Sequence, residues 1–115
     1  MVGFRNKMYT ISGKVIKGDG YGKKLGFPTV NLKTSTEALP PEGVYAGTAV
    51  LNDKQYRSGI VVGPNDKIEA HMIGYAGDAY GKQVVLTVQK FLREYKNFST
   101  EEELINQIKK DISLC

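Results

Sequence analysis

The sequence predicts a mainly β protein, a six-stranded antiparallel β-barrel of Greek-key type with one C-terminal α-helix packed outside it. Three observations support this prediction. Short apolar or alternating segments recur at nearly regular spacing, and turn-forming Gly, Pro, Asn and Asp residues separate them. A segment with helical periodicity follows the last of them. Closing the sheet into a barrel would also remove unpaired strand edges.

The expected strands are recognised by their apolar patterns and by the turns between them. Segment 67–74 alternates most clearly, because Ile68, Ala70 and Met72 fall on one face while Glu69 and His71 fall on the other. Segment 83–91, with nine residues, is among the longest strand patterns. In chain order, the predicted strands cover residues 9–16, 27–32, 43–51, 56–62, 67–74 and 83–91. The connections are a glycine-rich loop, a proline-bearing loop at 37–42, and turns at 52–55, 63–66 and 78–81.

The predicted helix begins after Ser99. Ser99 and Glu102 have the spacing of a capping box, in which each side chain accepts a hydrogen bond from the backbone N–H of the other residue. Three glutamates at 101–103 occupy the first turn, where the helix dipole favours negative charge. An apolar stripe recurs at helical spacing: Leu104, Ile105, Ile108 and Ile112. We expect this stripe to face the barrel.

Length and composition are those of an ordinary globular domain. The chain has 115 residues, of which 41% are hydrophobic and 24% charged, so we expect one domain spanning 1–115. Cys115 is the single cysteine, which excludes an intrachain disulfide and favours a reducing, cytoplasmic setting. No apolar run approaches membrane-helix length, so no membrane partner is expected. We expect a monomer.

Positive charge gathers with glycine in the first third of the chain. Residues 1–33 hold seven Lys or Arg and one Asp, whereas residues 34–115 hold nine basic and eleven acidic residues. Segment 13–31 alone contains five glycines and four lysines. Glycine permits close backbone approach to a ligand, and successive N–H groups can bind an anion. The segment matches neither the Walker A nor the dinucleotide-binding motif, so a hairpin loop with solvated lysines remains the alternative to a phosphate loop.

Three polar residues are candidates for chemistry. Thr29 and Asn31 follow Pro28 two residues apart, so in a strand their oxygens share one face and suit a hard cation such as Mg²⁺. Glu69 stands on an amphipathic strand, where a carboxylate can act as a general base. The alternatives are outward polar residues at a strand start for the first pair, and a solvent-facing glutamate for Glu69. His71 alone favours a structural role.

Taken in order, these motifs resemble the riboflavin kinase family, including the kinase module of bifunctional riboflavin kinase/FAD synthetases. The resemblance covers roughly residues 10 to 113. The matching blocks are Gly13-x-Val-x-x-Gly18-x-Gly20-x-Gly22, Leu25-Gly26-Phe-Pro-Thr29-Val-Asn31, Gly43-Val-Tyr-Ala-Gly, Ile68-Glu69-x-His71, Tyr80-Gly81, Phe91-Leu-Arg93-Glu-x-Lys-x-Phe98, and the final helix to Asp111.

The resemblance implies ATP-dependent phosphorylation of riboflavin to FMN, with riboflavin, FMN, ATP and ADP as partners and Mg²⁺ or another divalent cation as cofactor. It implies that Glu69 is the catalytic base. It assigns Thr29 and Asn31 to both metal and nucleotide, and places Arg93 in the flap near the flavin. The remaining implied nucleotide-binding residues are Gly18, Gly20, Gly22, Lys23 and Gly26.

The chain departs from the family at residues 62–67, which are shortened and lack the Thr-Phe that bacterial relatives usually carry there. A catalytically weak flavin- or nucleotide-binding module with the same barrel is therefore the alternative function. A nucleic-acid-binding barrel is a third hypothesis. It rests on the basic N-terminal third and is disfavoured because no interleaving of aromatic and basic residues is clear.

Overall fold

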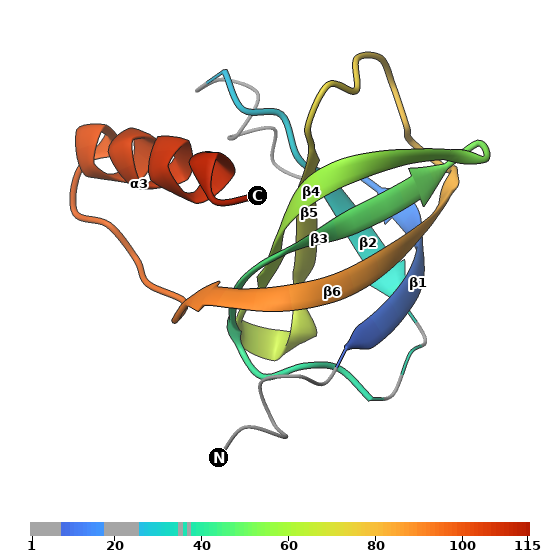
Figure 1. Ribbon diagram of the computed structural model, residues 1–115, viewed down its shortest axis with the longest axis horizontal. Coiled ribbons are helices and arrows are strands. Elements are labelled where there is room, and N and C mark those ends of the chain that lie inside the picture. Colours follow the sequence, from blue (N-terminus) through green and yellow to red (C-terminus); the bar gives the residue numbers. More distant parts are fainter. Residues whose placement is uncertain (1–7, 18–25, 35, 37) are drawn as a thin grey trace.

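The barrel and the C-terminal helix are both present in the computed structural model, which describes residues 8–17, 26–34, 36 and 38–115 (Figure 1). The elements in chain order are β1 (Tyr9–Ile16), β2 (Val30–Thr34), β3 (Gly43–Leu51), β4 (Lys54–Val62), the 3₁₀ turn η1 (Pro64–Asp66), β5 (Ile68–Met72), β6 (Gln83–Arg93) and α3 (Glu101–Ser113). This arrangement confirms the predicted fold class.

The sheet closes on itself in the strand order β1-β2-β5-β4-β3-β6, and β6 pairs back to β1. All six pairings are antiparallel. Three of them, β1 with β6, β2 with β5 and β3 with β6, join strands that are not consecutive in the chain. The pairing of β2 with β5 brings the segment after the glycine-rich loop against the strand that carries Glu69.

The barrel interior holds the core, because alternate residues of each strand point inward. The most buried large side chains include Ile11, Ile60, Ile68 and Leu86, all at most 1% exposed. Gly47 lets β3 approach β6 closely, since a Cβ there would lie 2.0 Å from the carbonyl oxygen of Thr87. The β3–β6 register also shifts between Ala46 and Gly47, which marks a local bulge at this contact.

Two strand starts differ from the sequence prediction by two or more residues, for local reasons. β4 starts at Lys54 rather than 56 because the hairpin turn is only Asn52 and Asp53, with φ of 52° and 64°. Both residues tolerate the left-handed region that a two-residue hairpin turn requires. β2 starts at Val30 rather than 27 and runs on to Thr34. Pro28 has no N–H for a ladder, so the chain joins the sheet only after it.

The helix begins one residue later than predicted. Thr100 is the N-cap, and its hydroxyl accepts a hydrogen bond from the Glu103 N–H at 3.1 Å. Ser99 Oγ instead donates to the Glu103 carboxylate, 3.1 Å from Oε2. The predicted Ser99–Glu102 capping box is therefore wrong, because the same sequence pattern fits both Ser99–Glu102 and Thr100–Glu103. α3 lies outside the barrel, as predicted, with its C-terminal end near β4 (Figure 1).

Candidate active site

Glu69 projects from the outer face of the barrel. It lies in the middle of β5 between Ile68 and Ala70, which are both buried, and its own side chain is half-buried. Its cross-strand partners are Asn31 on β2 and Val61 on β4. Directly opposed residues of an antiparallel pair share one face and lie close together. Glu69 and Asn31, which are candidates from the sequence for separate reasons, are therefore neighbours.

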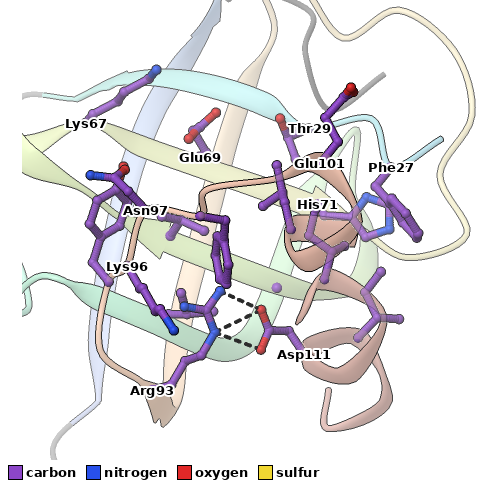
Figure 2. Close-up of a pocket in the computed structure, with 18 of the residues that line it drawn as sticks. Phe27, Thr29, Lys67, Glu69, His71, Arg93, Lys96, Asn97, Glu101 and Asp111 are labelled. Atoms are coloured by element: carbon purple, nitrogen blue, oxygen red, sulfur yellow. Dashed lines mark hydrogen bonds and ion pairs between the residues drawn. The ribbon is translucent and has the colours of Figure 1, made fainter. Parts of the chain in front are cut away.

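A cavity of about 540 Å³ lies beside Glu69, between the outer face of the barrel and α3 (Figure 2). Glu69, His71 and Thr29 line the barrel side. Three residues of the predicted stripe line the helix side: Leu104, Ile108 and Ile112. The apolar stripe of α3 therefore faces the barrel, as expected, and the cavity lies between the two. Its size and mixed apolar and polar walls are those of a small-molecule site.

His71 fixes the chain just before β2. Its Nδ1 lies 2.7 Å from the carbonyl oxygen of Pro28, and because a carbonyl only accepts, Nδ1 is the donor. The ring of Phe27 meets the His71 ring edge-on, with centroids 6.3 Å apart. These two contacts hold residues 27–28 against β5 and so position the adjacent Thr29 at the cavity. This supports the structural role favoured for His71.

A second recess, of about 600 Å³, is lined by Asn31, the cross-strand partner of Glu69. It is formed by β1, β2 and the connection between β4 and β5. Lys17, Lys33 and Lys67 line it, together with Asn31 and one acidic residue, Asp66. Lysine binds phosphate as a mobile point charge. The basic lining therefore suits an anionic ligand.

The glycine-loop predictions can be followed only in part. Gly18, Gly20, Gly22 and Lys23 lie outside the described residues. Gly26 is exposed with φ of +88°, a conformation that side chains rarely adopt, so glycine is required there by the backbone.

The possible metal ligands separate between the two cavities. Thr29 precedes β2 and lines the first cavity, whereas Asn31 lies within β2 and lines the second. Across residues 8–17, 26–34, 36 and 38–115, no cluster of three or more His, Cys, Asp or Glu could hold a metal. A hydroxyl and an amide oxygen are neutral, hard donors. They fit a cation such as Mg²⁺ that keeps water and phosphate oxygens as its main ligands.

Arg93 is engaged with the protein itself. Its Nη2 lies 2.9 Å from Asp111 Oδ2, and its Nε lies 3.0 Å from Asp111 Oδ1. Its Nη1 donates to the Glu94 carbonyl, and its guanidinium lies 5.5 Å from the Phe98 ring centroid. Asp111 is 8% exposed and also accepts from Gln107. Arg93 therefore ties the end of β6 to α3 while lining the first cavity, as Figure 2 shows.

The C-terminal end of α3 has a second attachment to the barrel. Arg57 on β4 donates from Nη2 to the carbonyl oxygen of Cys115. Burial and the Asp111 carboxylate raise the pKa of the Cys115 thiol, an effect that Arg57 partly opposes.

No helix in the described part of the chain is long and apolar enough to cross a membrane.

The barrel thus carries a cavity with mixed walls, which would suit a small molecule, and an adjoining recess lined by lysines, which would suit an anion. Comparisons with known proteins identify its class further. The family described as Flavokinase: Riboflavin kinase matches residues 5–115. The chain therefore belongs to the riboflavin kinase family.

Its relatives are longer proteins. A bifunctional riboflavin kinase/FMN adenylyltransferase of Escherichia coli K12 is 31% identical over 111 residues, covering 90% of this chain and 36% of the relative. The RNA-binding riboflavin kinase RibR of Bacillus subtilis 168 is 36% identical over 115 residues, covering 92% of this chain and 49% of that protein. The chain thus spans less than half the length of these two relatives.

Two solved structures share the fold. A crystal structure of a Streptococcus pneumoniae protein named macrolide-efflux protein superposes with a TM-score of 0.87 at 26% identity, covering 91% of this chain and 37% of that one. Riboflavin kinase from Trypanosoma brucei gives a TM-score of 0.69 at 21% identity, covering 93% and 74%. The second likeness supports the fold alone.

Proposed function

We propose that the protein phosphorylates riboflavin to FMN with ATP as phosphoryl donor. The observation that carries this proposal is the register pairing of Glu69 with Asn31. Glu69 lines the cavity with mixed walls, and Asn31 lines the basic recess. An acceptor bound in one cavity and a triphosphate bound in the other would therefore meet at this pair. Phosphoryl transfer depends mainly on such positioning and on charge stabilisation.

The first cavity would take the flavin. Its helix wall offers Leu104, Ile108 and Ile112 to the apolar ring system, and its barrel wall offers Glu69 to the ribityl hydroxyl. A carboxylate is too weak a base to remove an alcohol proton in advance. Glu69 would therefore orient the hydroxyl and accept its proton as the new bond to phosphorus forms.

The second recess would take the triphosphate. Lys17 and Lys33 supply positive charge there, and Asn31 supplies an amide. We propose that the glycine-loop residues Gly18, Gly20, Gly22, Lys23 and Gly26 cover the phosphates, as the family resemblance implies. Thr29 and Asn31 would hold the divalent cation, which when bound neutralises phosphate charge.

The alternative is a flavin- or nucleotide-binding module with little turnover. The short connection between β4 and β5 favours it, because this connection borders both cavities and consists of one 3₁₀ turn. Tight riboflavin binding measured by fluorescence quenching, without ATP consumption, would select this alternative.

The kinase proposal is tested by incubating the protein with riboflavin, ATP and Mg²⁺, with an EDTA control, and resolving the flavins by chromatography. Metal-dependent FMN is the expected product, and its absence would refute the proposal. Glu69→Gln should lower kcat by about 10²-fold or more, the usual scale for a general base, with riboflavin affinity little changed.

Glu42→Gln is the matched control for the base. Glu42 is exposed and lines neither cavity, so removing its charge should leave kcat unchanged. Full activity of Glu69→Gln would show that another group accepts the proton.

A further inference from the structure

Lys67 lies at the boundary between the two cavities. Among the residues that the structure describes, it is the one residue that lines both of them. It belongs to the shortened segment 62–67, where the sequence departs from the family pattern. A cation at this boundary can contact a ligand in either cavity.

The backbone at Lys67 is held by the turn that precedes β5. The Gly63 N–H donates to the Lys67 carbonyl at 2.8 Å, and the Lys67 N–H donates to the Pro64 carbonyl at 3.3 Å. Asn65 and Asp66 make the turn in the left-handed region, with φ of 59° and 58°. Asn and Asp adopt this region more readily than other non-glycine residues. The turn therefore fixes where the exposed lysine side chain begins.

Lys67 and Glu69 belong to the same side of the sheet. Residues two apart in an extended chain point the same way, and Ile68 between them is 1% exposed in the core. Figure 2 shows Glu69 between Lys67 and His71 along the barrel side of the cavity. No ion pair joins Lys67 to a carboxylate among the residues that the structure describes.

We propose that Lys67 stabilises the phosphoryl group while it moves from the nucleotide to the acceptor, an inference that rests on the proposed function. The bond between the γ-phosphorus and the β–γ bridging oxygen breaks as the acceptor hydroxyl oxygen bonds to phosphorus. The hydroxyl proton passes to Glu69, and the nucleoside diphosphate leaves. Negative charge spreads over the oxygens of the transferring group, and a positioned ammonium at the boundary opposes that charge.

The position of Lys67 separates its role from that of the other lysines. Lys17 and Lys33 line only the second recess, so their charge acts on the nucleotide before and during transfer. Lys67 also borders the cavity with Glu69, so its interaction should be strongest at the transition state. Its loss should therefore lower kcat more than it raises the KM for ATP.

The test compares Lys67→Met and Lys67→Arg with the wild-type protein. Lys67→Met should lower kcat about 10- to 10²-fold, below the usual effect of a buried donor because the side chain is exposed. The riboflavin dissociation constant should change less than about twofold, and arginine should restore most of the lost kcat because it keeps the charge. Lys54→Met removes an equal charge outside both cavities and should behave as wild type.

The outcomes separate this inference from the proposed function. Wild-type protein that forms no FMN would refute the function itself. Active wild type with unchanged kcat in Lys67→Met, or with only a raised KM for ATP, would overturn the role of Lys67 and leave the kinase proposal standing. Thermal melting verifies that each variant is folded. If Lys67→Met has a markedly lower Tm than the wild type, Lys67→Gln provides the same comparison of charge.

Discussion

Replacing Arg93 by methionine should loosen the attachment of α3 to the barrel. Arg93 and Asp111 are joined by three hydrogen bonds of 2.9 to 3.2 Å, and their side chains are 23% and 12% exposed. Breaking a fully buried ion pair costs about 3–5 kcal/mol, and an exposed one typically below about 1 kcal/mol. This pair is mostly buried and Asp111 would keep only its bond from Gln107. We therefore expect a loss of about 2–3 kcal/mol.

The measurement is the free energy of unfolding in urea near neutral pH, supported by thermal melting. For a chain of this length, a loss of that size lowers Tm by roughly 8–15 °C. Lys96→Met is the matched control. The Lys96 ammonium also lies 5.5 Å from the Phe98 ring centroid, but no carboxylate among the described residues pairs with it. Its replacement should cost less than about 1 kcal/mol.

A double-mutant cycle with Asp111→Asn isolates the pair itself. If Arg93 and Asp111 act together, the double variant should lose markedly less stability than the sum of the two single losses. Arg93→Met costing under about 0.5 kcal/mol, or strictly additive losses, would refute the conclusion that this pair fastens α3.

Two further substitutions test the helix start and the buried tyrosine by urea denaturation. Thr100→Ala removes the N-cap hydroxyl and should cost about 1 kcal/mol, whereas an equal or larger loss in Ser99→Ala would contradict the assignment of the cap. Tyr45→Phe removes the 2.6 Å hydrogen bond to the Pro41 carbonyl and should cost about 1 kcal/mol near neutral pH. Burial, and then Tyr9, raise the pKa of Tyr45 above 10.0, so its stabilising contribution is complete below that pH and falls as pH rises through the folded-state value. In Tyr45→Phe, the free energy of unfolding should not show this fall at alkaline pH. A pH profile equal to that of the wild type would contradict this role of Tyr45.

The fold was predictable because its signals are local. The alternation around Glu69 places Ile68 and Ala70 in the core, as the sequence predicts. Turn residues such as Asn52 and Asp53 mark where strands end. The error at the helix start arose because the neighbouring residues Ser99 and Thr100 carry the same signal, whereas the late start of β2 follows from Pro28.

The site was predictable residue by residue but not as an arrangement. Glu69 and Asn31 could be chosen from the sequence, yet their adjacency follows from the non-local pairing of β2 with β5. The partner of Arg93 is Asp111, eighteen residues away on another element. Periodicity carries no signal for that contact. The position of Lys67 between two cavities likewise depends on tertiary packing. The roles of Gly18, Gly20, Gly22 and Lys23 stay predictions because these residues lie outside the described structure.

The register of β5 links correct folding to the exposure of Glu69. Glu69 is opposed by Asn31 on one side and Val61 on the other. A slip of one residue would turn the Glu69 side chain inward and bring Ile68 or Ala70 to the surface. Burying an unpaired carboxylate is costly, so the misaligned barrel is disfavoured by the same residue that we propose as the base. The cost of burying Glu69 should therefore also favour the correct register of β5. A preparation of this protein that forms FMN would thereby report that its strands are correctly paired.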